Sequence, residues 1–313
     1  MSADQEHEES SAGSAPDRPH APGLYLVATP IGNLEDITLR ALRVLRSADR
    51  IACEDTRQTQ KLLNHFSIRT PTVSYHRHNE ASRAIELVAE LKSGARIAVV
   101  SDAGTPGIAD PGGQIAAAAI AAGVPVFPIP GANAAISALI ASGLGNSPTS
   151  DAGPDANLER FTFHGFLPAK EGQRRTALEA LRTAHSTGAQ IFYEAPHRIL
   201  ATLVDIETIF GPAQHIVLAR ELTKLHEEFL RGAVSEIRAT LAARATVRGE
   251  IVLLFTPAAA SVAADTPATT IAAEVRTLTQ QGLSEKDALK QIARARNLSK
   301  SAAYRELQRE RSK

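Results

Sequence analysis

Glycine, proline and small polar residues gather in three segments that each follow a short apolar run. The segments are residues 29–34, residues 101–112 and residues 130–135. Glycine permits a positive φ or a close backbone approach, and proline stiffens the chain. Such loops can present main-chain N–H and C=O groups to a small planar ligand. Taken one at a time they are more often ordinary turns, but three at equivalent places favour a ligand site.

The apolar runs and the patterns between them predict the elements that position these loops. Strands are expected at residues 24–28, 50–53, 97–100 and 124–129, and amphipathic helices at 39–45, 85–91 and 114–122. In the first helix Leu39, Leu42 and Leu45 recur with an arginine beside each. In the second helix, Ile85, Val88 and Leu91 form the expected buried face. Strands alternating with helices predict a mostly parallel α/β sheet, whose ligands bind beyond the carboxyl ends of the strands.

The alternation resumes in the second half of the chain. Strands are expected at residues 161–163, 190–193, 215–219 and 250–255, with helices at 173–184 and 199–210. The fold class is therefore α/β, with two α/β domains and a small C-terminal helical unit. The expected boundaries are a disordered acidic leader at 1–21, an N-terminal α/β domain at 22–145, a loop insertion at 146–157, a C-terminal α/β domain at 158–257, a linker at 258–269 and a basic helical unit at 270–313.

Composition excludes several classes of protein. A single cysteine rules out a disulfide framework, and no Cys/His cluster has the spacing of a zinc site. No apolar run is long enough to span a membrane, and no secretory signal is evident, so we expect a soluble, cytoplasmic protein. Familiar nucleotide signatures are also missing: no G-x-G-x-x-G follows the first strand, and no G-x-x-x-x-G-K-[ST] occurs.

The net charge is zero, because 34 Lys and Arg balance 34 Asp and Glu. Taken alone, neutrality argues against a nucleic-acid partner. The balance is uneven along the chain, however. Residues 1–20 carry five acids and one base, a net of −4, whereas residues 270–313 carry ten bases and five acids, a net of +5. Neutrality is therefore compatible with a local basic surface that binds RNA.

Nine short motifs, in this order, resemble those of the ribosomal RNA small subunit methyltransferase I family. They are A-T-P-I-G-N-L-E-D-I-T at residues 28–38, E-D-T-R at 54–57, H-N-E at 78–80, S-D-A-G-T-P at 101–106, D-P-G at 110–112, G-F-L-P at 165–168, F-Y-E-A-P-H-R at 192–198, A-R-E-L-T-K at 219–224 and R-G-E at 248–250. The resemblance covers residues 23–256. The chain departs from the family at Ala132, where proline is usual, and in the longer stretch at 145–157.

The resemblance implies a tetrapyrrole-methylase fold with S-adenosylmethionine bound in a cleft between the two domains, and usually a homodimer. It implies methylation of a cytidine ribose 2′-hydroxyl in the decoding region of 16S ribosomal RNA, without a metal. The positions that match the family's cofactor-binding motifs are Pro30, Gly32, Asp102, Ala103, Gly104, Thr105, Asp110, Ala134, Ala135, Leu167, Tyr193 and Gly249.

A ribose hydroxyl is a poor nucleophile, so a nearby base should accelerate its methylation by roughly 10²–10⁴. The candidates are Glu54, Asp55, His78, Glu80, Glu194 and Glu221. We favour Glu194 and Glu54 as catalytic residues, because both follow short strands and could point into the cleft. For each carboxylate, a structural salt bridge or a helix cap is an equal alternative.

Several basic residues in the matching motifs are candidates for holding RNA. They are Arg57, His78, His197, Arg198, Arg220 and Lys224. Arg220 could instead pair with a carboxylate inside the protein, and His76 and His78 could simply be exposed.

The C-terminal pattern predicts three short helices resembling a helix-turn-helix, with Ser284 and Ser299 as N-caps. Basic residues that could follow a nucleic-acid backbone are Lys300, Arg305, Arg309, Arg311 and Lys313; the alternative is a solvated charged bundle.

Two other functions stay open. One is a small-molecule methyltransferase of the tetrapyrrole or diphthamide type with the same fold. The other is a non-enzymatic nucleic-acid regulator that acts through the C-terminal helices.

Overall fold

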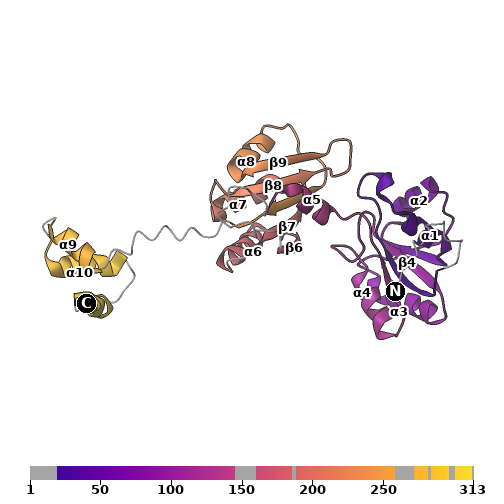
Figure 1. Ribbon diagram of the computed structural model, residues 1–313, viewed down its shortest axis with the longest axis horizontal. Coiled ribbons are helices and arrows are strands. Elements are labelled where there is room, and N and C mark those ends of the chain that lie inside the picture. Colours follow the sequence, from indigo (N-terminus) through magenta and orange to yellow (C-terminus); the bar gives the residue numbers. More distant parts are fainter. Residues whose placement is uncertain are drawn as a thin grey trace, which may run out of the picture. The chain divides into compact units, whose positions relative to one another are not determined.

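The computed structural model describes residues 20–144, 160–184, 188–257, 271–280, 283–295 and 300–311 (Figure 1). The chain divides into two compact units, Met1–Pro257 and Ala258–Lys313. Residues 1–19 of the expected leader, the expected insertion at 146–157 and the expected linker at 258–269 lie outside the described residues. His20 and Ala21, which we assigned to the leader, are described. His20 Nδ1 lies 2.9 Å from Ser47 Oγ, and the Ala21 carbonyl accepts a hydrogen bond from Tyr25 Oη.

The first sheet is entirely parallel. Its strands are β1 (Gly23–Val27), β2 (Arg50–Cys53), β3 (Thr72–Ser74), β4 (Arg96–Val100) and β5 (Val126–Ile129), in the order β3-β2-β4-β1-β5. The four predicted strands are confirmed. Strand β3 was not predicted, because its three residues form too short an apolar run to stand out.

Helices cover both faces of the first sheet. They are α1 (Leu39–Ser47), α2 (Thr56–His65), α3 (Glu80–Lys92) and α4 (Gly113–Ala121), and a 3-10 helix, η1 (Leu34–Asp36), precedes α1. Helices α1 and α2 contribute to one buried cluster, and α3 and α4 to another. The predicted buried face of α3 was wrong in part, because Ile85 is 75% exposed. The residues that pack on the sheet are instead Ala84, Leu87 and Leu91.

The second sheet is mixed, which corrects our expectation of mostly parallel pairing. Its strands are β6 (Phe161–Phe166), β7 (Ala189–Glu194), β8 (His215–Arg220), β9 (Glu228–Ala233) and β10 (Ile251–Phe255), in the order β6-β7-β10-β8-β9. Only β6 and β7 pair in parallel. The reversal comes from β9, which forms a hairpin with β8; its sequence, E-F-L-R-G-A, lacks the apolar run that would predict a strand.

Two sets of helices enclose the second sheet. Helices α6 (Glu171–Thr183), α7 (Ile199–Phe210) and α8 (Val234–Ala242) contribute to one buried cluster. Helix α5 (Ala134–Ser142) contributes to another, where Ala138 and Leu139 join Ile191 and Val217. This helix follows β5 of the first sheet, yet it packs on the second sheet (Figure 1). Helix α5 therefore ties together the two halves of this unit. The first half is residues 20–144, which carry the first sheet, and the second half is residues 160–257, which carry the second sheet.

The C-terminal unit contains α9 (Ile271–Gln280), α10 (Glu285–Ala295) and α11 (Lys300–Arg311). Its small core includes Ile271, Val275, Ile292 and Leu307. The predicted cap of α10 is confirmed, because the Asp287 N–H donates to Ser284 Oγ at 3.2 Å. The predicted cap at Ser299 lies outside the described residues. None of the helices that the structure describes is long and apolar enough to cross a membrane.

Two arginines of α6 meet one buried carboxylate of α7, and this contact yields a stability prediction. Arg174 Nε and Arg175 Nε donate to Asp205 at 2.6 and 2.7 Å. Replacing Asp205 with Ala should lower the free energy of unfolding by about 3 kcal/mol, because Arg174 would remain as a buried, uncompensated charge. Urea unfolding followed by circular dichroism measures the loss. The control is Glu171→Ala, which removes an exposed partner of Arg175 and should cost less than about 1 kcal/mol; equal losses would contradict the prediction.

Candidate active site

The three predicted loops are bonded to one another at the carboxyl edge of the first sheet. Thr29 and Gly104 exchange two backbone hydrogen bonds, of 2.8 and 3.0 Å. Thr105 Oγ1 donates to the Ala132 carbonyl at 3.1 Å, and Asn133 Nδ2 donates to Thr105 Oγ1 at 3.4 Å. The loops after β1, β4 and β5 therefore form one continuous wall.

A buried glutamate holds the second part of the loop that follows β4. Glu80 Oε1 accepts a hydrogen bond from Tyr75 Oη at 2.8 Å and another from the Gly112 N–H at 3.1 Å. Gly112 has a φ of 140°, which favours glycine. Glu80 was one of our candidate bases, but in the structure it anchors the segment that carries Asp110.

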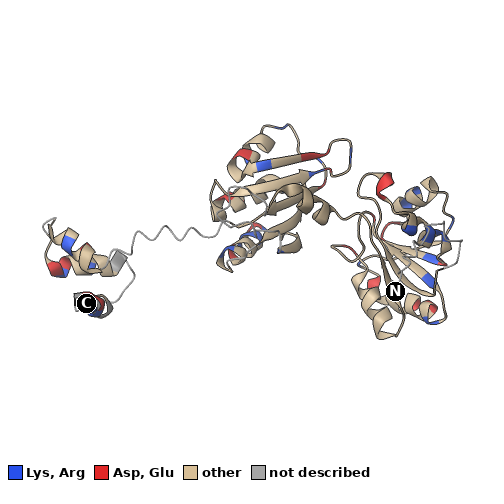
Figure 2. Ribbon diagram, in the orientation of Figure 1, with Lys and Arg blue, Asp and Glu red and all other residues tan. Residues whose placement is uncertain are grey.

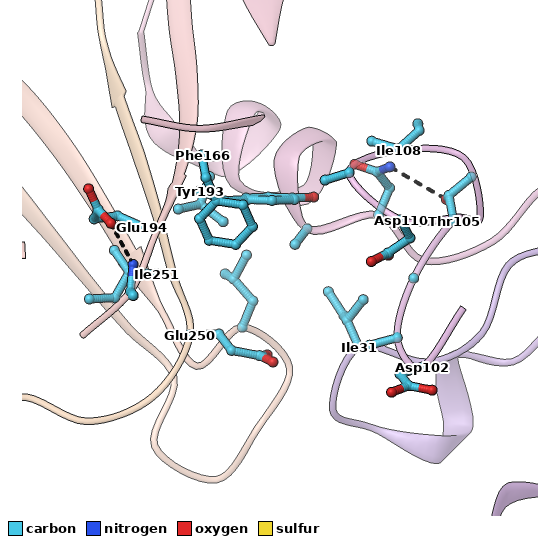
Figure 3. Close-up of a pocket in the computed structure, with 18 of the residues that line it drawn as sticks. Ile31, Asp102, Thr105, Ile108, Asp110, Phe166, Tyr193, Glu194, Glu250 and Ile251 are labelled. Carbon is cyan, nitrogen blue, oxygen red and sulfur yellow. Dashed lines mark hydrogen bonds between the residues drawn. The ribbon is translucent and has the colours of Figure 1, made fainter. Parts of the chain in front are cut away.

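This wall faces the second sheet across a cavity of about 440 Å³, a size typical of small-molecule sites (Figure 3). The first half of the unit contributes Ile31, Glu54, Asp102, Ala103, Gly104, Thr105, Ile108, Ala109, Asp110, Asn133 and Ala134. The second half contributes Phe166, Tyr193, Glu194, Ala195, Pro196, Leu222, Glu250, Ile251 and Val252.

The structure brings seven of the twelve predicted cofactor-binding residues to this cavity. They are Asp102, Ala103, Gly104, Thr105, Asp110, Ala134 and Tyr193. Pro30, Gly32, Ala135, Leu167 and Gly249 do not line it. Binding of a cofactor by any of the twelve stays a prediction.

The two glycines among these five residues, Gly32 and Gly249, lie where another part of the chain comes close to the backbone. A Cβ on Gly32 would lie 2.4 Å from Lys224 Cγ and 3.1 Å from the Leu222 carbonyl oxygen. A Cβ on Gly249, whose φ is 92°, would lie 2.4 Å from Glu221 Cγ. Gly32 therefore lets the loop after β1 pack against the loop after β8, at the border of the cavity.

Five carboxylates line the cavity: Glu54, Asp102, Asp110, Glu194 and Glu250. Glu194 and Glu250 have the cationic partners Arg198 and Lys224, so the negative character comes chiefly from the other three. The pKa of Asp110 is raised to about 6, chiefly by burial and then by the negative charge of Glu54, with smaller effects from Asp102 and Glu250. Asp102 Oδ1 accepts a hydrogen bond from the Asp55 N–H at 3.1 Å. Among the described residues, Glu54 has no hydrogen-bond or ion-pair partner.

Glu194 lies at the border of the cavity, but its carboxylate is bound inside the protein. Its Oε1 accepts from the Ala195 N–H at 2.8 Å and its Oε2 from Thr202 Oγ1 at 2.6 Å (Figure 3 shows the first bond). Arg198 Nε lies 3.1 Å from Oε1, and Arg198 also donates to the Leu167 carbonyl at 2.6 Å. These contacts match the salt bridge that the sequence left open as an alternative, and they give no support to Glu194 as a base.

Two other candidate bases also have partners within the protein, and a third lies away from the cavity. Asp55 caps α2 by accepting from the Arg57 N–H at 2.8 Å. Glu221 accepts from Lys224 Nζ at 2.8 Å and from the Glu250 N–H at 3.0 Å. His78 is exposed and does not line the cavity. Of the six candidates, Glu54 alone combines a place on the cavity wall with a carboxylate that no described residue binds.

None of the six predicted RNA-contact residues lines the cavity. Arg57, His78 and His197 are exposed. Arg198 is held by Glu194, as described above. Arg220 donates to Glu228 at 2.9 Å, which is the internal pairing left open by the sequence, and Lys224 Nζ lies 3.1 Å from Glu250.

Sequence reasoning missed several residues of the cavity wall, among them Ile108, Asn133, Phe166 and Glu250. Asn133 had a usable signal, because it sits in a predicted loop just before an apolar helix, and its Oδ1 indeed caps α5. Phe166 and Glu250 lie in the matching motifs at 165–168 and 248–250, but only the packing of the second half against the first shows that they reach the cavity. In the parts of the chain that the structure describes, no group of three His, Cys, Asp or Glu could hold a metal ion.

Comparisons with known proteins add sequence relatives. The profile of the Tetrapyrrole (Corrin/Porphyrin) Methylases matches residues 23–238. The chain is 53% identical over 231 residues to ribosomal RNA small subunit methyltransferase I of Halalkalibacterium halodurans, with 74% of each chain covered. It is 45% identical over 281 residues to the protein of that name from Synechocystis, with 90% of this chain and 95% of the relative covered.

Solved structures share the fold. Diphthine synthase matches with a TM-score of 0.56 at 15% identity, over 74% of this chain and 89% of that one. Uroporphyrin-III-C-methyltransferase from Thermus thermophilus matches with a TM-score of 0.50 at 21% identity, over 75% and 94%. At these identities the likeness shows the fold alone.

The raised pKa of Asp110 predicts a pH-dependent effect on stability. The folded protein binds the Asp110 proton more tightly than the unfolded chain does, so the contribution of the protonated group is complete below about pH 4 and is lost as the pH rises through 6. Asp110→Asn should therefore stabilise the protein at pH 8, by about 1 kcal/mol after allowance for solvent screening, and have little effect at pH 4.

Thermal melting at the two pH values measures this difference. The control is Asp36→Asn, an exposed residue outside the cavity, which should change the melting temperature little at either pH. A stabilisation by Asp110→Asn that is equal at pH 4 and pH 8 would show that the pKa of Asp110 is not raised in the folded protein.

Proposed function

Because the chain belongs to the ribosomal RNA small subunit methyltransferase I family of tetrapyrrole methylases, we propose that it methylates small-subunit ribosomal RNA. It is a methyltransferase by family; the donor we propose is S-adenosylmethionine, and the acceptor is the ribose 2′-hydroxyl of a cytidine in the decoding region. The observation that carries the proposal is the acidic cavity between the two halves, in which no described residue binds the carboxylate of Glu54.

The residues of the cavity suit this donor. S-adenosylmethionine would supply an electrophilic methyl carbon beside a positively charged sulfur. The carboxylates of Asp102 and Asp110 complement positive charge, since opposite charges attract strongly in a partly buried site. The apolar side chains of Leu222, Ile251 and Val252 offer a surface for an adenine ring, and the Gly104 loop exposes backbone groups for hydrogen bonding.

We assign the base to Glu54. Its carboxylate would accept a hydrogen bond from the ribose hydroxyl and take up the proton as the oxygen bonds to the methyl carbon; the carbon–sulfur bond of the donor would break, with its electron pair left on sulfur as a neutral thioether. Acceptance of a proton by a placed group contributes roughly 10²–10⁴ in rate. The rest of the rate comes from holding the two reacting groups in line, which the bonded loops are rigid enough to do.

We assign Glu194 a positioning role in place of its predicted catalytic one. It holds Arg198, which in turn binds the backbone carbonyls of Leu167 and Pro168. Glu194 therefore fixes the segment that follows Phe166, on the second wall of the cavity.

RNA as the acceptor is favoured by the names of the relatives and by the basic C-terminal unit, in which Arg276, Lys286, Lys290 and Arg309 are exposed. An enzyme of this kind would work in the cytoplasm, and we propose a homodimer because the family resemblance implies one. The alternative acceptor is a small molecule of the tetrapyrrole type, which the breadth of the wider family keeps open.

The assigned reaction predicts that the purified protein transfers a labelled methyl group from S-adenosylmethionine to small-subunit ribosomal RNA or to isolated small subunits. Nucleoside analysis should find the label on the ribose of cytidine. Label on a base would contradict the assigned atom. Transfer to a porphyrin precursor but not to RNA would favour the small-molecule alternative, and the absence of S-adenosylmethionine binding in calorimetry would refute the proposed donor.

Glu54→Gln should lower kcat by 10²–10⁴ while the Kd for S-adenosylmethionine changes little, because the amide keeps the shape but cannot take up the proton. Single-turnover kinetics and calorimetry measure the two effects. The matched control is Glu179→Gln, an exposed position of α6 outside the cavity. If Glu54→Gln retains the rate of the control, another group is the base.

A further inference from the structure

Helix α1 carries three exposed arginines, Arg40, Arg43 and Arg46. They recur every third residue and thus rise about 4.5 Å per step along the helix. The opposite side of the helix is buried, because Ala41 and Val44 pack in the core of the first sheet. We refer to the three arginines as the α1 arginine row.

The row lies in the most basic part of the first half of the unit. Residues 38–70 contain seven Lys and Arg but only three Asp and Glu. In Figure 2, basic residues recur along α1 and α2. Because the net charge of the whole chain is zero, this concentration is a local feature and not an effect of overall composition.

What distinguishes the row is its lack of carboxylate partners. Nearby arginines are neutralised: Arg50 pairs with Glu90, Arg57 with Asp55 and Arg96 with Asp49. The arginines of the row make no ion pair with any residue that the structure describes.

The partners that the row does have are neutral. Arg40 donates to the Pro128 carbonyl at 3.3 Å, and Arg46 donates to the Phe66 carbonyl at 3.2 Å. Carbonyl oxygens orient a guanidinium without cancelling its charge, so each arginine keeps donors for an incoming anion.

The same positive charges act on a neighbouring histidine. His20 lies beside the last turn of α1, with Nδ1 2.9 Å from Ser47 Oγ. Its pKa is lowered by burial and then by the charges of Arg43, Arg40 and Arg96. Arg40 and Arg43 therefore both contribute positive potential at the surface around His20.

The row also starts near the cavity. The loop after β1 contributes Ile31 to the cavity wall and reaches α1 only seven residues later, where Thr38 caps the helix. In a parallel α/β sheet a helix begins at the edge where the preceding strand ends. Arg40 in the first turn is therefore on the cavity side of this half, and Arg46 in the last turn is farther away.

We propose that the α1 arginine row binds the phosphates of the RNA strand that flanks the target nucleotide. This inference rests on the proposed function. Neutralisation of phosphates by arginine supplies most of the sequence-independent affinity of RNA-binding proteins and makes it depend on salt. An exposed, unpaired row that runs away from the cavity suits a backbone that must remain in place while one ribose enters the cavity.

The test compares two charge-matched double variants, R40Q/R43Q and R160Q/R182Q. Arg160 and Arg182 are exposed positions of the second half, outside both the row and the cavity. Fluorescence anisotropy with a labelled decoding-region RNA gives the Kd at a series of salt concentrations. R40Q/R43Q should weaken binding about tenfold and reduce the slope of log K against log salt by roughly 1.5, since each phosphate contact contributes about 0.7–0.9. R160Q/R182Q should match the unmodified protein.

Further readouts separate this inference from the proposed function. R40Q/R43Q should leave the Kd for S-adenosylmethionine and the kcat at saturating RNA unchanged, because the row does not touch the cavity. An unchanged salt slope would overturn the inference even if cytidine methylation is observed. A reduced slope without any cytidine methylation by the unmodified protein would support RNA binding by the α1 arginine row and refute the proposed methylation reaction.

A single variant protects the test against misfolding. Arg43→Gln changes the one member of the row whose side chain forms no hydrogen bond with a described residue, so this variant should fold normally and reduce the slope by roughly 0.8. A melting temperature equal to that of the unmodified protein confirms the fold, and an unaltered slope in this variant would again overturn the inference.

Discussion

The pair of backbone hydrogen bonds between Thr29 and Gly104 is the contact on which the site depends. It joins the loop after β1 to the loop after β4, and Thr105 and Asn133 extend the connection to the loop after β5. None of these bonds involves a charged group, so titration of the cavity carboxylates does not break them. The segment that carries Asp110 is held differently, by the buried carboxylate of Glu80.

Charge is divided between two parts of this half of the molecule. The carboxylates of Glu54, Asp102 and Asp110 gather in the cavity, where burial and mutual repulsion shift the titration of Asp110 toward neutral pH. The arginines of the α1 row, which form no ion pair with any described residue, lie outside, on the surface of the helix. A polyanion would be repelled from the cavity and attracted to the helix beside it. This separation favours entry of a single uncharged group, such as a hydroxyl, while the phosphates stay outside.

The parallel first sheet and its three loops could be predicted from the sequence, because short apolar runs indicate buried strands and glycine and proline indicate the loops that follow them. The sequence did not predict the mixed second sheet, since β9 owes its pairing with β8 to position and not to an apolar pattern. The same limit applies to the site. Spacing placed Glu54 and Glu194 after strands, but only the packing reveals that Arg198 and Thr202 occupy one carboxylate and leave the other without a partner. Phe166 and Glu250 lie in motifs that match the family, but only tertiary packing brings them to the cavity.

Helix α5 belongs to the first half by chain order and to the second by packing, and this has a consequence for synthesis on the ribosome. The residues that bury its apolar face, Ile191, Val217 and Val252 among them, are translated some 50–110 residues after it. Until they emerge, a nascent chain would display Ala138 and Leu139 to solvent beside an otherwise complete sheet. Exposed apolar surface on a partly made protein promotes aggregation, so the growing chain should be prone to aggregate during that interval. The two halves are therefore poor candidates for separate expression.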